Sequence, residues 1–349
     1  MKRITCLSLL LALTVTVSAQ QSSTPSSKHD ATFWLGADIS GATEQERRGV
    51  QLRNSQGEPR ECTALMRELG LNAVRLRVWV NPKGGLSDKA DVVRMARRAK
   101  DWGMAVMIDF HYSDWWADPG QQNIPAAWKD MDYATMCRAL ADHTRDVLTA
   151  VKQTGADVRW VQVGNETPNG FLWPVGDSHK NLRQYAGLTD AGYQAVKQVL
   201  PQAQVIVHLD AAYDPKHYDY IFDGLNKYHA RYDMIGLSVY PYWDMKGKHT
   251  QSWQETVEKA TANINRLWNK YHKPMMVVET GAEAKKPVEG KQIIAAVIDM
   301  ARNQTGGHCL GVFYWAPEAD RGYKLGAFQH NRPTIIMEAF TEAAQKECE

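Results

Sequence analysis

Two glutamates follow strand-like apolar runs and stand far apart in the chain. Glu166 ends the segment VQVGNE (161–166), directly after Asn165, and Glu279 ends the segment MMVVE (275–279). An unpaired carboxylate is costly to bury, so a carboxylate at the end of an apolar strand is expected to have a functional role. A retaining glycosidase uses two carboxyl groups roughly 5 Å apart, one as acid/base and one as nucleophile. The alternative for either glutamate is a solvated loop position. The sequence therefore predicts a paired-carboxylate active site.

The elements that must position these glutamates alternate regularly along the chain. Between the apolar runs lie amphipathic helical patterns such as ECTALMRELG (61–70), and several of them end at glycine. No glycine-rich nucleotide turn interrupts the alternation, so the pattern favours an α/β fold of the (β/α)8 TIM barrel type over a doubly wound sheet. The predicted strands are 32–40, 72–80, 104–112, 157–165, 203–210, 232–240, 274–280 and 309–315.

The active site of such a barrel lies at the carboxyl ends of its strands. Reading those ends in order gives Asp38, Arg77, Trp79, Asp109, His111, Asn165, Glu166, His208, Asp210, Tyr240, Glu279 and Trp315. A ring of polar and aromatic side chains is hard to satisfy in a closed core and suits a water-filled cleft. We therefore expect Asp109 to contact the substrate.

Seven of the twelve tryptophans fall at strand ends or in the loops that follow them. They are Trp79, Trp115, Trp116, Trp128, Trp173, Trp243 and Trp315. The apolar faces of sugar rings stack on indoles, while a few polar groups hold the hydroxyls. Packing of the barrel rim is the alternative for any single tryptophan. We expect Trp79, Trp115 and Trp116 among the substrate contacts.

Two arginines and two histidines near the strand ends can each be interpreted in two ways. Arg75 and Arg77 share one face of the second predicted strand, where they neutralise buried acids or keep the nucleophile ionised. His111 and His208 are either satisfied rim histidines or residues that orient the carboxylates or the sugar. No histidine or carboxylate recurs at metal-ligand spacing, so we expect neither a metal nor a cofactor.

The amino terminus has the pattern of an export signal. Lys2 and Arg3 precede an apolar run that ends in small residues at 17–19, which predicts a signal peptide over 1–19. A polar, serine-rich lead-in covers 20–32. Residues 33–349 are then a single catalytic domain of an exported protein, periplasmic or secreted.

Charge and hydrophobicity exclude two classes of partner. Without Lys2 and Arg3 the chain has 39 basic and 39 acidic residues, and nucleic-acid binding usually needs a basic face. No segment after the signal peptide is long and apolar enough to be a membrane anchor. We expect a monomer. Export permits disulfides, and Cys62 with Cys348 is the pairing we would test first, because the first and last barrel helices are neighbours.

The chain resembles glycoside hydrolase family 53, the endo-β-1,4-galactanases, among the retaining (β/α)8 enzymes. The matching segments run in order through nearly all of the chain after the signal peptide. They are GADIS (36–40), VRLRVW (74–79), DFHYSDWWADPGQQNIPAAW (109–128), VQVGNET (161–167), SVYPYW (238–243), VVET (277–280) and GVFYW (311–315).

The resemblance implies an arabinogalactan endo-β-1,4-galactanase that cuts the galactan of pectin side chains internally and releases galacto-oligosaccharides. It implies Glu166 as acid/base and Glu279 as nucleophile. The substrate contacts that it implies are Arg75, His111, Asn165, His208, Tyr240 and Trp315. An endoglycanase acting on mannan, xylan or glucan is the alternative, and a non-catalytic carbohydrate-binding barrel is a more distant one.

Two departures from the family pattern matter. Many bacterial members bind calcium in a long loop after strand seven, whereas here only 281–292 separates that strand from the next predicted helix. The resemblance therefore predicts a shorter cleft without that calcium site. The familiar Trp-Glu-Pro after strand eight is here Trp315-Ala316-Pro317, which removes one polar contact.

Overall fold

The computed structural model describes residues 32–319 and 322–346, and its main compact unit begins at Phe33. The predicted signal peptide and nearly all of the predicted lead-in lie outside the described residues. The predicted boundary of the catalytic domain at residue 33 thus remains a prediction on its amino-terminal side.

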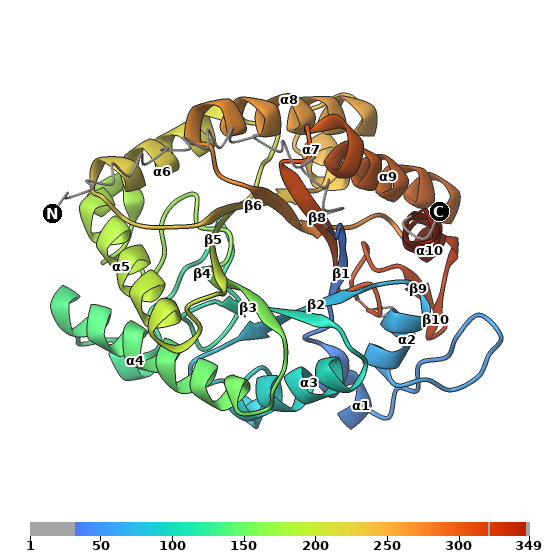
Figure 1. Cartoon of the computed structure of the whole chain (residues 1–349), viewed down its shortest axis with the longest axis horizontal. Coiled ribbons are helices and arrows are strands. Elements are labelled where there is room, and N and C mark those ends of the chain that lie inside the picture. Colours follow the sequence, from blue (N-terminus) through green and yellow to red (C-terminus); the bar gives the residue numbers. More distant parts are fainter. Residues whose placement is uncertain (1–31, 320–321, 347–349) are drawn as a thin grey trace, which may run out of the picture. The chain divides into compact units, whose positions relative to one another are not determined.

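Eight parallel strands close into a barrel in sequence order, with each strand hydrogen-bonded to its two neighbours. Figure 1 shows these strands ringed by helices. The strands are β1 (Trp34–Asp38), β2 (Ala73–Val78), β3 (Ala105–Phe110), β4 (Val158–Val163), β5 (Gln204–Leu209), β6 (Met234–Val239), β7 (Met275–Thr280) and β8 (Cys309–Trp315). All eight predicted strands and the TIM barrel are confirmed, with most strands one or two residues shorter at their ends than expected.

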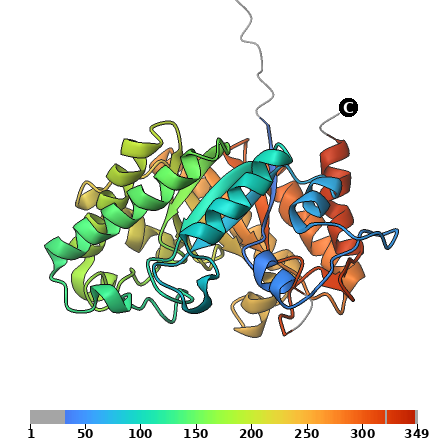
Figure 2. The ribbon, with the colours of Figure 1, turned by 90° about the horizontal axis from the view of Figure 1, so that it is seen from below.

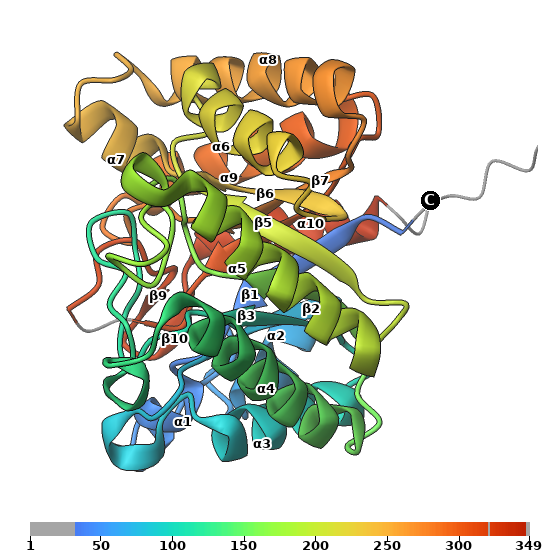
Figure 3. The same cartoon turned by 90° about the vertical axis from the view of Figure 1, so that its left-hand side faces the viewer.

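The helices lie between the strands and cover the outer face of the barrel. Figure 3 shows α4, α5 and α6 side by side over that face. The helices are α1 (Ala42–Arg47), α2 (Cys62–Glu68), α3 (Lys89–Asp101), α4 (Tyr133–Lys152), α5 (Ser178–Val199), α6 (Pro215–Lys227), α7 (Pro241–Lys246), α8 (Trp253–Tyr271), α9 (Pro287–Asp299) and α10 (Glu338–Gln345). A small hairpin of β9 (Phe328–Gln329) and β10 (Arg332–Pro333) precedes α10.

Several helices begin where the sequence supplies a cap. The carboxylate of Asp88 accepts from the backbone N–H of Asp91 at the start of α3, and Asp132 does the same for Thr135 at the start of α4. Helix α9 begins with Pro287, a residue suited to a first helical turn. It therefore starts earlier than expected, and only residues 281–286 connect it to β7.

The hydrophobic core has two parts. The larger part packs the outer face of the strands against the helices, and the smaller part fills the interior of the barrel on the side away from the carboxyl ends of the strands. The loops that follow the strands gather at one end, which is the lower edge of Figure 2, where α1 and α7 follow β1 and β6. This end holds the cavity described below.

No disulfide forms among the described cysteines, and the pairing of Cys62 with Cys348 stays a prediction. Cys62 is a buried free thiol, and Cys137 and Cys309 are free as well. Cys348, the expected partner of Cys62, lies outside the described residues.

Candidate active site

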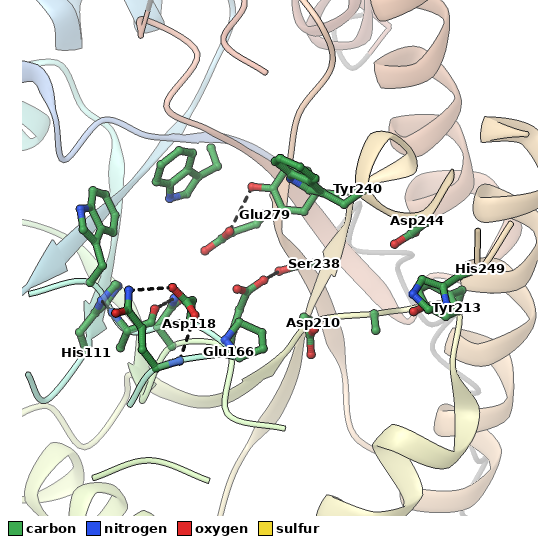
Figure 4. Close-up of a pocket in the computed structure, with 18 of the residues that line it drawn as sticks. His111, Asp118, Glu166, Asp210, Tyr213, Ser238, Tyr240, Asp244, His249 and Glu279 are labelled. Carbon is green, nitrogen blue, oxygen red and sulfur yellow. Dashed lines mark hydrogen bonds between the residues drawn. The ribbon is translucent and has the colours of Figure 1, made fainter. Parts of the chain in front are cut away.

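A cavity of about 690 Å³ opens at the carboxyl ends of the strands. Figure 4 shows Glu166 and Glu279 facing each other across it, with His111 and Asp118 on one side and Asp210, Tyr213, Asp244 and His249 on the other. Of the residues predicted for the site, the lining includes His111, Trp116, Asn165, Glu166, Tyr240, Glu279 and Trp315. His111 and Trp315, for example, are 204 positions apart in the chain, so the closed barrel is what brings these residues together.

A tight turn after β4 presents Glu166. Gly164 has φ +89°, and a Cβ there would lie 2.6 Å from the side chain of Thr167, so the position requires glycine. Glu166 itself has φ +41°, an uncommon value for a residue with a side chain. The amide of Gln122 donates to the carbonyl oxygens of Asn165 (2.8 Å) and Glu166 (3.0 Å) and holds this turn. The surrounding loop thus fixes a strained backbone at Glu166.

A chain of hydrogen bonds orients the Glu166 carboxyl group. Ser238 of β6 donates to its Oε1 at 2.6 Å, and the Nε2 of His208 lies 2.8 Å from the Ser238 hydroxyl. The backbone N–H of Glu166 donates to His208 Nδ1 (3.3 Å), so His208 has its proton on Nε2. Burial holds the pKa of His208 well below its usual value. His208 is therefore neutral and acts on Glu166 through Ser238.

Glu279, at the end of β7, has a different environment. Its Oε1 lies 2.9 Å from the Nη1 of Arg75, and its Oε2 accepts from the Tyr240 hydroxyl at 3.1 Å. Both contacts favour the ionised carboxylate. A nucleophile requires that form.

The two carboxyl groups differ in their ease of ionisation. Burial raises the pKa of Glu166 well above its usual value, and the charges of Glu279 and Asp210 add to the rise. Burial also raises the pKa of Glu279, to about 7, but the Arg75 guanidinium opposes that rise. Because the Arg75 guanidinium contacts Glu279 directly, and no guanidinium in the described part of the chain contacts Glu166, Glu279 loses its proton first. The two carboxyl groups lose their protons in two steps that belong to the pair, and Glu166 keeps its proton to higher pH than Glu279 does.

Arg75 connects several polar side chains of the site. Its Nε donates to Gln162 (2.6 Å), its Nη1 to Asp38 (2.8 Å), and its Nη2 to Asn165 (2.7 Å). It also lies 2.9 Å from a carboxylate oxygen of Asp109. A planar guanidinium can hold this many acceptors in fixed directions, which a lysine cannot. The same residue therefore orients the carboxyl group of Glu279 and the amide of Asn165 beside Glu166.

The structure corrects three predicted substrate contacts. Arg75, Asp109 and His208 are fully buried and do not line the cavity. Asp109 instead accepts from His111 Nε2 at 3.0 Å, and Arg75 and His111 outweigh the effect of burial and lower the pKa of Asp109. These residues lie one layer beneath the wall and position the groups that face the cavity.

Asn165 does face the cavity. Its Oδ1 accepts from Arg75, and its Nδ2 donates to the carbonyl oxygen of Ala117 at 2.8 Å. One amide hydrogen of Nδ2 remains for a ligand.

Two aromatic residues of the predicted set are placed differently from expectation. Trp79 is 3% exposed, and Trp115 is 59% exposed on the rim, where it stacks on Trp79 at 5.1 Å. Neither lines the cavity. The aromatic wall consists of Trp116 and Trp315, with ring centroids 5.6 Å apart, and Tyr323 edge-on to Trp315 at 4.7 Å.

Some lining and supporting residues were absent from the sequence prediction. They are Gln122, Gln162, Asp118, Tyr213, Ser238, Asp244, His249 and Tyr323. Ser238 and Gln162 could have been found, because they lie on the inward face of β6 and β4, two residues before Tyr240 and Gly164. Tyr213, His249 and Tyr323 come from loops whose course no local pattern specifies.

Within residues 32–319 and 322–346, no group of three or more His, Cys, Asp and Glu side chains is arranged to hold a metal ion. In the same part of the chain, no helix has the length and apolar character needed to cross a membrane.

Comparisons with known proteins agree with this site. A family model described as "Glycosyl hydrolase family 53" matches residues 34–289. A probable arabinogalactan endo-β-1,4-galactanase A of Aspergillus fumigatus is 30% identical over 319 residues, covering 84% of this chain and 86% of the relative. The endo-β-1,4-galactanase of Bacillus subtilis is 31% identical over 314 residues, covering 82% and 70%.

A solved structure of a fungal β-1,4-galactanase superposes with a TM-score of 0.80 at 28% identity, covering 88% of this chain and 99% of that chain. The family match spans well over half of the sequence, and both strands that carry the facing glutamates fall within it. The chain belongs to glycosyl hydrolase family 53.

Proposed function

We propose that this protein is a retaining endo-β-1,4-galactanase that hydrolyses the β-1,4-galactan of type I arabinogalactan by double displacement. One observation carries the proposal: the half-buried carboxyl group of Glu166 and the buried one of Glu279 have opposite environments and face each other across a cavity walled by tryptophans. Family membership and the names of the relatives support galactan as the substrate.

In the first step Glu166 gives its proton to the departing glycosidic oxygen. The carboxylate of Glu279 attacks the anomeric carbon, so a glycosyl-enzyme ester forms as the carbon–oxygen bond breaks. Burial suits Glu166 to hold a proton near neutral pH, and Arg75 with Tyr240 suits Glu279 to be ionised. In the second step Glu166 takes a proton from water, the oxygen of that water attacks the same carbon, and Glu279 leaves as a carboxylate.

The surrounding residues account for binding and orientation. The free amide hydrogen of Asn165 is placed to donate to the hydroxyl beside the reacting carbon, a contact that strengthens in the transition state. Trp116 and Trp315 offer apolar faces to the sugar ring. His111, Tyr240 and the buried Arg75 keep these groups in place.

We also propose that the protein is exported, to the periplasm or beyond, and acts as a monomer without a membrane anchor. The charged start, apolar run and small residues at 17–19 support export.

The test is hydrolysis of potato galactan beside mannan, xylan and cellulose, with the products sized and their first-formed anomer identified by NMR. We expect internal cleavage of galactan alone and β-configured products. Preference for one of the other glycans, or α-configured products, would contradict the proposal. Binding of galactan without hydrolysis would favour a non-catalytic barrel.

A further inference from the structure

A second cavity, of about 310 Å³, shares Trp116, Trp315 and Tyr323 with the catalytic cavity. These three side chains form the aromatic wall described above, so the wall borders both cavities. Side chains that border a cavity have fewer packing contacts there than in a closed core. The position of the wall therefore depends on the residues that do contact its rings.

Trp116, in the loop after β3, is held by ring contacts alone. Within residues 32–319 and 322–346, its indole N–H makes no hydrogen bond that would fix the ring. Its neighbours are Trp79, edge-on at 5.3 Å, and the tilted rings of Trp315 at 5.6 Å and His111 at 6.2 Å. The one cation against the ring is that of Arg77, within the same residues.

Arg77, on β2, places its guanidinium against two indoles. Its Cζ lies 3.9 Å from the ring centroid of Trp116 and 4.3 Å from that of Trp79. The two rings are nearly perpendicular, with an interplanar angle of 85°. Indole faces attract cations, and the attraction is stronger out of water. Because Arg77 is only 6% exposed, its contact with Trp116 is of this stronger kind.

The partners of Arg77 differ from those of Arg75. Arg75 pairs with three carboxylates, whereas Arg77 makes no ion pair in the described part of the chain. Its Nη2 donates to the Ser87 hydroxyl at 3.0 Å, and its Nε has no partner there. Burial lowers the pKa of Arg77 to about 10, so the guanidinium is still charged at neutral pH. A buried charge needs compensation, and the two indole faces provide it here.

We propose that Arg77 is a positioning residue that holds the Trp116 indole in place as a platform for a sugar ring. The proposal rests on the proposed function and adds the residue that fixes one of its binding surfaces. Arg77 lines the second cavity and does not line the catalytic one, so it does not touch the substrate. Its effect on binding passes through Trp116.

The test is a double-mutant cycle on the binding of β-1,4-galactotetraose, measured by calorimetry in protein that carries Glu279→Ala and does not hydrolyse the ligand. Arg77→Met keeps the length of the side chain and removes the guanidinium, and we expect Kd to rise about tenfold. Trp116→Ala should raise Kd at least as much. In protein that already carries Trp116→Ala, Arg77→Met should change Kd by less than about twofold.

Arg159→Met is the matched control, because Arg159 also covers an indole. Its Cζ lies 4.7 Å from the ring centroid of Trp34, and neither residue lines the catalytic cavity. Its substitution should leave Kd unchanged. In protein that retains Glu279, Arg77→Met should raise KM for galactotetraose and leave kcat within about threefold of the unaltered value.

An unchanged Kd in Arg77→Met would overturn the proposal. A rise in Kd that is equally large with and without Trp116 would do so too, as would a fall in kcat at unchanged KM. If Arg77→Met does not fold, Arg77→Lys takes its place in the cycle, because it keeps the charge and loses the planar group. Absence of both binding and hydrolysis of galactotetraose in the unaltered protein would instead overturn the proposed function, so the two failures are distinguishable.

Discussion

The interior of the barrel has two layers of opposite chemistry, although the same strands build both. The layer farther from the cavity, called the lower layer below, is apolar. It consists of Ala73, Ala105, Met107, Trp160, Ile206, Met234, Met276, Val278 and Phe313. The upper layer, directly toward the cavity, consists of Asp38, Arg75, Asp109, Gln162, His208, Ser238 and Glu279. On β3 the change from Met107 to Asp109 takes one step of the strand's alternation.

The two layers are stabilised in different ways. The lower layer gains free energy from burial of apolar area, as any core does. The upper layer places charges out of water, which is costly unless they are paired and hydrogen-bonded. Arg75 supplies that pairing for Asp38, Asp109 and Glu279 together. We therefore expect substitutions in the lower layer to affect mainly stability and substitutions in the upper layer to affect mainly activity.

The largest effect is expected from Glu279→Ala. Removal of the nucleophile should lower kcat on galactan by more than about 10⁴-fold, beyond what general acid–base catalysis alone supplies. Arg75 keeps Asp38 and Asp109 as partners, so the free energy of unfolding should change little. Steady-state kinetics and urea unfolding of the same preparation check both statements. A folded variant with substantial turnover would remove Glu279 from its role.

Phe313→Ala makes the opposite change, in the lower layer. Phe313 is fully buried, edge-on to Trp160, and its ring occupies the space beside Gly36. We expect a loss of about 3–5 kcal/mol in the free energy of unfolding, because the cavity cannot close. In the folded variant kcat/KM should stay within a few-fold of the unaltered value. A large catalytic loss without destabilisation would contradict the division between the layers.

Glu318→Gln tests a buried acid outside the upper layer. Glu318 is 1% exposed, neither of its carboxyl oxygens has a hydrogen-bond partner among residues 32–319 and 322–346, and burial raises its pKa to about 8. The folded protein then keeps a proton that the unfolded chain releases, so stability falls as the pH rises from the ordinary glutamate value to about 8.

The glutamine variant should lack that fall and be more stable by a few kcal/mol at pH 8. Thermal unfolding across this pH range measures it. The exposed Glu258→Gln serves as the matched control. Parallel pH curves for Glu318→Gln and the unaltered protein would count against a buried, neutral Glu318.

Ser238→Ala should have the smallest effect. It removes the hydrogen bond that favours the ionised form of Glu166, so the pKa of Glu166 should rise. Activity needs this group protonated, and the alkaline limb of the kcat/KM profile should therefore move to higher pH. We expect an activity loss of no more than about tenfold at the optimum. A shift of that limb to lower pH would show that another group controls it.

The strand pattern predicted much of this arrangement. Eight apolar runs of the right length imply a closed barrel, and closure alone brings Glu166 and Glu279 to one cavity. The polar layer beneath the cavity could not be predicted in the same way. Which acids Arg75 binds depends on strand register and side-chain direction around the barrel, and the sequence does not state these. The burial of Asp109 and His208 was missed for that reason.

Loop geometry set the second limit. Residues 214–248 separate Tyr213 from His249, and their stacking follows from the course of two loops after β5 and β6. Tyr323 reaches Trp315 from the segment after β8 in a similar way. The half of the cavity beside β5 and β6 therefore became visible only with the fold.

The central claim is that Glu279 is the nucleophile and Glu166 the acid/base. The most direct measurement is mass spectrometry of peptides from protein incubated with a 2-deoxy-2-fluoro galactobioside bearing a good leaving group, which slows release of the glycosyl-enzyme. We predict one added glycosyl unit, located on the peptide that contains Glu279. Attachment at Glu166, or turnover to an inverted product without any covalent adduct, would contradict the account.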